Sequence, residues 1–243
     1  MNFGIQLLVW GDYACWTRPE MKAERVSYDV MTPSGARGIL EAIYWKPQIR
    51  WVIDRIRVLA PIRFVNLRRN EVKFTRLSLS SRVLQGKEPA PAIYVDENRE
   101  QRASLLLQKV QYGIEAHLQL LDKRERDGTQ LRHPQAKHLD QFFRRARAGA
   151  CYHRPYLGCR EFPAHFAVVD AAHPFPAPPP ELQLERELGF MLYDIDHDGY
   201  PAAVGPSHRC SERCRPRFFR AKLVDGLLDV AACLQQSRQE FGL

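Results

Sequence analysis

The sequence lacks the motifs with which several enzyme classes hold their substrates. It has no glycine-rich phosphate loop of the Walker or dinucleotide-binding kind, and its serine, histidine and aspartate residues show no triad spacing. No internal repeat is present. These absences argue against the nucleotide-hydrolysing and dinucleotide-binding classes. They also favour a chemistry in which no protein side chain is the nucleophile.

Membrane and secretion signals are missing as well. No apolar run approaches the ~20 residues that span a bilayer. The first residues, MNFGIQLLVWGDYACW, have no basic segment before the apolar stretch and reach Asp12 early, which is typical of a buried strand and not of a signal peptide. Six cysteines at irregular spacings fit reduced thiols better than a disulfide framework: Cys15, Cys151, Cys159, Cys210, Cys214 and Cys233. We therefore expect a cytoplasmic protein without a membrane partner.

Positive charge is in excess. Lys and Arg outnumber Asp and Glu by 36 to 28, which gives a net charge of +8. The basic residues gather in two stretches, 132–160 and 209–222. This distribution favours a polyanionic partner, nucleic acid above all, although a solubilising surface would have the same composition.

The periodicity of the first 60 residues predicts a strand, a helix and a second strand. Apolar residues alternate in FGIQLLV, residues 3–9, as in a strand. Thr32 can cap a helix that begins at Pro33 and ends near Trp45 or Lys46, because Pro47 disfavours helical geometry in the residue before it. The stretch QIRWVIDRIRVL is a second strand whose apolar phase shifts between Ile53 and Ile56, which indicates a bulge or burial on both faces.

The next 110 residues predict a strand, a helix and another strand. Alternation over residues 110–120 is typical of a strand with one polar face, residues 137–148 have a helical apolar stripe, and EFPAHFAVV is a further strand. The order strand, helix, strand, strand, helix, strand predicts an α+β fold with a ferredoxin-like, RNA-recognition-type domain over residues 1–170. Its helices would cover one face of the sheet and leave the other open, a common place for RNA.

A small antiparallel β unit is expected over residues 171–243. The stretch AAHPFPAPPPEL has five prolines in twelve residues and forms an extended connection. Two strand-like segments follow, Asp225-Gly226 fits a two-residue hairpin turn, and the chain is expected to finish in a short polar tail.

Two short motifs suggest metals without completing a site. DIDHDG, Asp194 to Gly199, opens like an EF-hand loop, but the position of the closing glutamate holds Gly205. HRCSERC brings together His208, Cys210 and Cys214, which is one ligand short of a structural zinc site. A polar turn and a solvated or phosphate-contacting loop are the alternatives, so no metal is predicted.

RNA supplies its own nucleophile, the 2′-hydroxyl beside each phosphate. A protein that cuts there need only remove its proton, protonate the leaving oxygen and stabilise the negative transition state. Lys137 and His138, at the start of a basic helix, could do this without a metal or cofactor if they lie in the loop or first turn. By itself, a Lys-His pair beside a basic helix is more often a solvated surface than an active site. His117, on the polar face of its strand, is a second candidate to which the same applies, and Tyr44 fits either the core or an exposed helix end.

Four long stretches resemble the Cas-five-d family of CRISPR-associated proteins (subtype I-C, Dvulg). They are VWGDYACWTRPEMKAERVSYDVMTPSGARGILEAIYWKP, PIRFVNLRRNEV, YLGCREFPA and PRFFRAKLVDGLLDV, and the likeness extends from about residue 6 to 230. The resemblance implies a ferredoxin-like domain followed by a small β domain. It also implies metal-independent cutting of CRISPR repeat RNA at the 3′ base of its hairpin, leaving a 5′-hydroxyl and a 2′,3′-cyclic phosphate.

The resemblance also implies a site and partners. The family's active site is a tyrosine in YWKP and a later Lys-His pair, which fall here on Tyr44, Lys137 and His138. The partners would be pre-crRNA, whose 5′ handle the protein keeps, and the Cas-seven backbone and Cas-eight large subunit of the type I-C complex. Contact with double-stranded DNA stays open, and a scaffold that grips the handle without cutting it is the main alternative. For RNA contacts the sequence offers five arginines: Arg68, Arg69, Arg144, Arg145 and Arg147.

Overall fold

The computed structural model describes residues 4–21, 23–73, 79–89, 92, 94–123, 128, 130, 132–196 and 214–241. Its largest element is a six-stranded sheet of order β5-β1-β4-β2-β8, with β3 also paired to β4. Every ladder between these strands is antiparallel. The strands are β1 (Gly4–Ala14), β2 (Ile49–Val58), β3 (Phe64–Val72), β4 (Arg99–Leu120), β5 (His165–Val168) and β8 (Leu227–Asp229). The fold is therefore mixed α/β with mostly antiparallel sheets, in agreement with the predicted class.

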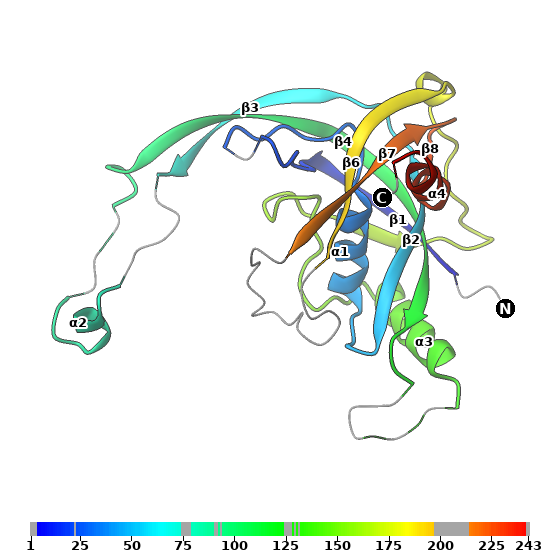
Figure 1. Cartoon of the computed structure of the whole chain (residues 1–243), viewed down its shortest axis with the longest axis horizontal. Coiled ribbons are helices and arrows are strands. Elements are labelled where there is room, and N and C mark those ends of the chain that lie inside the picture. The colour runs from blue at the N-terminus through cyan, green and yellow to red at the C-terminus, as the bar shows by residue number, and fades with distance from the viewer. Residues whose placement is uncertain are drawn as a thin grey trace.

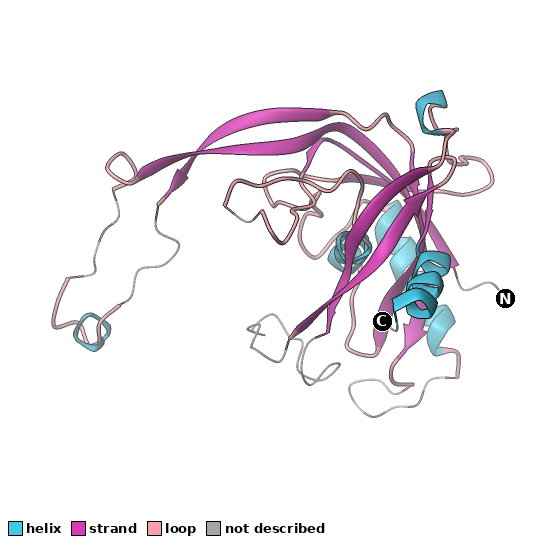
Figure 2. Ribbon diagram, turned by 45° about the horizontal axis from the view of Figure 1, so that its top comes forward, coloured by secondary structure: helices cyan, strands magenta, loops and turns pink. Residues whose placement is uncertain are grey.

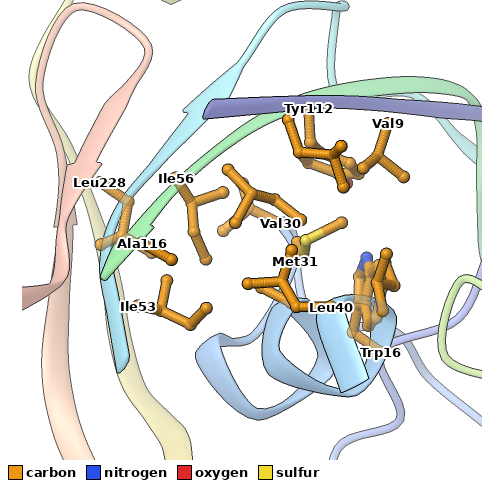
Figure 3. Packing of buried hydrophobic residues seen from close by; sticks show 14 of the residues in the cluster. Val9, Trp16, Val30, Met31, Leu40, Ile53, Ile56, Tyr112, Ala116 and Leu228 are labelled. Atoms are coloured by element: carbon orange, nitrogen blue, oxygen red, sulfur yellow. The ribbon is translucent and has the colours of Figure 1, made fainter. Parts of the chain in front are cut away.

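The helices α1 (Pro33–Ile43) and α3 (Pro134–Arg147) contact this sheet and each other. Thr32 caps α1 as predicted, because its hydroxyl accepts a hydrogen bond from the Gly35 amide at 3.2 Å. The apolar sides of strands and helix meet in the core, where Val9 and Tyr112 point from the sheet toward Met31 and Leu40 (Figure 3). The core thus joins the sheet to α1.

The predicted irregularity in β2 is confirmed. The register between β2 and β4 shifts between Ile53 and Arg55. As a result Ile53 and Ile56, three residues apart, are both buried.

A long two-stranded arm was not predicted. β3 and the first half of β4 extend beyond the rest of the molecule, and α2 (Ser81–Leu84) lies at the far end (Figures 1 and 2). The sequence predicted only residues 110–120 of the 22-residue β4 as a strand. The outer part of the arm has no buried face, so its residues lack the apolar alternation from which a strand is recognised.

The expectation of an open sheet face needs correction. The proline-rich connection after β5 lies against this face, and a Cβ built on Gly113 of β4 would come within 2.6 Å of the Phe175 ring. The Arg57 guanidinium stacks over the same Phe175 ring, 5.6 Å from its centre. Because glycine has no side chain, the connection can approach the sheet here and cover the middle of its face.

The C-terminal residues form the two-stranded sheet of β6 (Arg186–Asp196) and β7 (Arg215–Leu223), preceded by the 3₁₀ turn η1 (Pro180–Leu182). Asp225 and Gly226 both have positive φ, at 50° and 72°, which confirms the predicted tight turn. The strand β8 that follows joins the large sheet beside β2. The boundary at residue 170/171 stays a prediction.

The prediction of a short polar tail was wrong, because residues 230–241 form the helix α4 (Val230–Phe241). Val230, Cys233 and Ser237 are buried on one side of it, and the Ser237 hydroxyl accepts a hydrogen bond from the Arg220 amide of β7 at 2.9 Å. Three buried residues at helical spacing are enough to dock an otherwise polar helix. Among the described residues, no helix is long and apolar enough to cross a membrane.

Candidate active site

Tyr44 lies where α1 stops. It is the C-cap residue of the helix, with an extended backbone (φ −151°, ψ 120°), and its amide still bonds to the Leu40 carbonyl. Its own carbonyl accepts a hydrogen bond from the Trp51 indole of β2 at 3.0 Å. The chain therefore leaves the helix in a fixed direction, and the Tyr44 side chain turns toward α3.

His138 meets Tyr44 from the first turns of α3. The Tyr44 hydroxyl and His138 Nδ1 lie 2.8 Å apart, although 94 residues separate them in the sequence. Tyr44 is 9% exposed and His138 4% exposed. This hydrogen bond brings together two of the three residues that the sequence selected, and it gives a proton a direct route between a phenol and an imidazole.

Lys137 points elsewhere. It belongs to the same turn, and its amide bonds to the carbonyl of His133, the N-cap residue of α3, at 3.1 Å. Its side chain is exposed whereas that of His138 is buried. Adjacent helical residues project about 100° apart, so one can enter the protein while the other faces solvent. The pair was predicted to lie in the loop or first turn, but α3 begins at Pro134, so Lys137 and His138 are its fourth and fifth residues and do not share one face.

Two contacts hold the end of α1 near this pair. Arg145 of α3 donates from Nε to the Ile43 carbonyl at 2.7 Å, and the Tyr152 amide donates to the Ala42 carbonyl at 2.7 Å. These carbonyls have no partner within the helix, because they lie in its last turn. Arg145 therefore fixes the residue before Tyr44. No local sequence pattern predicts this contact, since it joins the side chain of one helix to the backbone of another.

The other selected arginines have varied surroundings. Arg69 is ion-paired to Glu71 at 3.1 Å and to Glu161, and it also donates to Ser104. Arg68 is exposed on β3. Arg144 donates to Gln141 at 2.6 Å from the exposed side of α3, and the Arg147 guanidinium lies 5.4 Å from the Phe143 ring centre. Arg68, Arg144 and Arg147 thus reach solvent, while Arg69 and Arg145 are held within the protein. Their role as phosphate contacts stays a prediction.

His117 does not join the Tyr44 pair. It lies on the polar face of β4, where its Nδ1 is 2.9 Å from both carboxylate oxygens of Asp54. Its side chain is about half exposed. Because β4 alternates, this face is opposite to the one against which α1 and α3 pack.

The predicted alternatives with metals gain no support from the described residues. Asp194, in the DIDHDG stretch, is buried and ion-paired to Arg37 and Arg50, the latter at 3.0 Å. His197, Asp198 and Gly199 of that motif, together with His208 and Cys210, lie outside the described residues. Within the described part of the chain, no group of three or more His, Cys, Asp or Glu residues is arranged to hold a metal ion.

One reactive group, the thiol of Cys159, was not predicted from the sequence. Arg25 donates from Nη1 to Cys159 Sγ at 3.3 Å. A hydrogen bond from Cys15 and the charge of Arg25 lower the pKa of Cys159 to about 6, although burial acts in the opposite direction. The same thiol contact, with burial, raises the pKa of Cys15. Cys15 and Cys159 lie 144 positions apart in the numbering, so no local pattern could have paired them.

Comparisons with known proteins agree with this description. The sequence model of the Cas5d family, described as CRISPR-associated protein (Cas_Cas5), matches residues 4–231. The CRISPR pre-crRNA endoribonuclease Cas5d of Mannheimia succiniciproducens is 45% identical over 93% of this chain and 94% of its own length. The protein of the same name from Thermus thermophilus is 39% identical over 94% of this chain and 91% of its own length.

Solved structures share the fold at lower identity. The crystal structure of a CRISPR-associated protein is 18% identical, with a TM-score of 0.59 over 96% of this chain and 93% of its own. That of a functionally uncharacterized protein from Streptococcus mutans is 19% identical, with a TM-score of 0.56 over 93% and 90%. With the family model and both sequence relatives in agreement over nearly the full length, the chain belongs to the Cas5d family of CRISPR-associated proteins.

Proposed function

We propose that this protein is a metal-independent endoribonuclease that cuts CRISPR repeat RNA at the 3′ base of its hairpin. The 2′-hydroxyl attacks the adjacent phosphate, so the products carry a 2′,3′-cyclic phosphate and a 5′-hydroxyl. Both sequence relatives are named as CRISPR pre-crRNA endoribonucleases, which supports the substrate and the reaction class. The alternative is a subunit that binds the 5′ handle of the guide without cutting.

The hydrogen bond between Tyr44 and His138 is the observation that carries the proposal. His138 can accept the proton of the 2′-hydroxyl directly. Tyr44 can accept it only as a relay, because its hydroxyl must pass its own proton to His138 Nδ1 as it takes up the new one. Histidine is the better base at neutral pH, since its ordinary pKa is about 6.5. Lys137 supplies a positive charge for the developing phosphorane. Because both rings are nearly buried, the RNA backbone must approach at the exposed neighbours Trp45 and Lys137.

The fold proposed together with this function is a ferredoxin-like core. The strand order β5-β1-β4-β2, with α1 after β1 and α3 after β4, supports it. The unit over residues 171–243 would then be an addition to that core. Its β8 strand extends the sheet beyond β2, so the addition and the core would unfold together.

The partners proposed are pre-crRNA, the crRNA 5′ handle, and the Cas-seven and Cas-eight subunits of the type I-C complex. The net charge of +8 and the exposed Arg68, Arg144 and Arg147 support a polyanionic ligand. Membership of the Cas5d family supports the choice of these subunits. Copurification of guide RNA with the assembled complex tests them, and loss of guide RNA when this subunit is omitted is the expected result.

Single-turnover cleavage of the cognate repeat RNA in excess EDTA tests the function. Wild-type protein is expected to cut, and a 2′-deoxy nucleotide on the 5′ side of the scissile phosphate should abolish cutting because it removes the nucleophile. Tyr44→Phe and His138→Ala should each slow the reaction by about 10² to 10⁴. Phosphatase-resistant 3′ ends would identify the cyclic phosphate.

Three outcomes would contradict the proposal. Tight repeat binding without cutting by the wild-type protein favours the scaffold alternative. Cutting that stops in EDTA and returns with a divalent cation would show that the Tyr44–His138 pair does not act by itself. Cutting that persists in Tyr44→Phe and His138→Ala would place the reaction elsewhere on the protein.

A further inference from the structure

Trp10 is the most exposed tryptophan that lies within a strand. It belongs to β1, whose residues Ile5, Leu7 and Val9 face the core. Trp10 points to the opposite face and keeps 36% of its surface exposed. Burial of an indole is among the largest apolar contributions that one residue can make, so its exposure in a regular strand requires a reason.

The indole is held in place by His165. Trp10 and His165 are register partners on β1 and β5, and their rings stack with centroids 5.8 Å apart and an angle of 21° between the planes. Nearly parallel rings on neighbouring strands have little freedom to rotate. The two side chains therefore form a rigid aromatic surface on the sheet before any ligand arrives.

The connection that covers this sheet face leaves the Trp10 corner accessible. Phe175 lies over Gly113, which is the register partner of Leu8. Trp10 lies two residues further along β1, opposite Gln111 of β4. The face is thus covered at its middle and exposed at the aromatic pair.

The neighbouring strand β4 carries a positively charged residue two positions from the register partner of Trp10. Lys109, two residues before Gln111 on β4, is exposed and forms no ion pair within the described part of the chain. Its backbone has φ 50°, a left-handed conformation that costs a non-glycine residue about 1 kcal/mol. Strained backbone of this kind is concentrated at functional sites. A cation beside an aromatic surface is complementary to a base and its phosphate.

We propose that the stacked pair Trp10–His165 binds one unpaired nucleobase of RNA, with Lys109 at the adjoining phosphate. This rests on the RNA binding of the proposed function but not on its chemistry, because the site lies on the sheet face opposite to α1 and α3. Stacking on an aromatic ring selects unpaired over paired bases and tolerates any base, since every base has a π face. The site would hold a single-stranded flank of the substrate and not its hairpin stem.

Tryptophan fluorescence gives a direct measurement. Of the four tryptophans, Trp16 and Trp51 are buried and Trp45 is exposed. In a Trp45→Phe background, the fluorescence of Trp10 should be quenched by a single-stranded 12-nucleotide RNA and much less by a duplex of the same sequence. Quenching that is equal for both, or that persists after Trp10→Phe, would overturn the proposal.

The RNA affinities of variants distinguish a contribution from stacking from one of charge and from a loss of folding. Trp10→Ala should weaken binding of the single-stranded RNA about 5- to 100-fold without changing the salt dependence, whereas Trp10→Phe should keep most of the affinity. Lys109→Ala should reduce the slope of log affinity against log salt by about 0.7. Phe190→Ala, which removes another exposed aromatic from β6, is the matched control and should change neither.

The outcomes distinguish this site from the proposed reaction. If the wild-type protein cuts repeat RNA and Trp10→Ala binds the single-stranded RNA as tightly as the wild type, the stacking site is contradicted while the proposed function is supported. If the wild-type protein binds through Trp10 without cutting, the site stands and the endonuclease assignment fails. A loss of affinity in Trp10→Phe equal to that in Trp10→Ala would indicate a structural role and would overturn stacking.

Discussion

The Tyr44 hydroxyl and His138 Nδ1 form a 2.8 Å hydrogen bond between the end of α1 and the first turns of α3. Both side chains are buried, while the neighbouring Lys137 is exposed. The three selected residues therefore contribute differently to stability, and this difference can be measured.

His138→Ala should lower both activity and stability. It removes the Nδ1 partner of a buried hydroxyl, which costs about 1 to 3 kcal/mol of unfolding free energy. Lys137→Ala should slow cleavage and leave the unfolding free energy within about 0.5 kcal/mol of wild type, because its side chain is exposed. Urea unfolding and single-turnover cleavage measure the two effects. Lys137→Arg, which keeps the charge, is the control; if it is as slow as Lys137→Ala, charge stabilisation by this residue is excluded.

Arg144 and Arg145 are adjacent but should behave differently. Arg145→Ala removes the donor to the Ile43 carbonyl, so we expect a lower melting temperature and slower cleavage from a displaced Tyr44. Arg144→Ala should leave the melting temperature unchanged and reduce the salt slope of RNA binding by about 0.7 to 0.9. Thermal unfolding measures the effect of each variant on stability, and binding titrations at several salt concentrations measure its effect on the salt slope. An unchanged salt slope in Arg144→Ala would remove it from the phosphate contacts.

Cys159 should react as a thiolate near neutral pH. Its pKa is lowered to about 6 by the hydrogen bond from Cys15 and by Arg25, so the alkylation rate should rise through about pH 6 and level off by about pH 8. Cys15→Ala and Arg25→Ala should each move the rise toward the ordinary thiol pKa of 9.0. Peptide mass spectrometry after brief iodoacetamide treatment gives the rate, with Cys151 as the internal comparison. A Cys159 rate still rising at pH 9 would disprove the assignment.

Asp194 should be structural and not a calcium ligand. Asp194→Asn leaves Arg37 and Arg50 without their shared carboxylate, which is 5% exposed. Breaking a buried ion pair costs about 3 to 5 kcal/mol, and the partial exposure of both arginines reduces this to about 2 to 3 kcal/mol. Urea unfolding measures the loss. Stabilisation of the wild-type protein by millimolar calcium, absent in Asp194→Asn, would instead support the calcium loop.

Local patterns predicted the elements of the core correctly. The alternation of Ile5, Leu7 and Val9, the Thr32 cap and the phase shift after Ile53 each reflect constraints within a few residues. The arm and α4 were missed for the same reason. The outer arm buries no face, and α4 is polar except for the few residues that dock it, so neither has a strong periodic signal.

By itself the sequence determined which residue types could perform metal-free RNA cleavage, and its resemblance to the family selected Tyr44, Lys137 and His138 among them. Only the tertiary structure decided their arrangement: His138 faces Tyr44, Lys137 faces solvent, and Arg145 holds the end of α1. The physical reason is that side-chain direction at a helix end depends on how two helices pack on a shared sheet. That packing is set by core residues far from the site, such as Leu40 and Phe142, and not by the residues of the site itself.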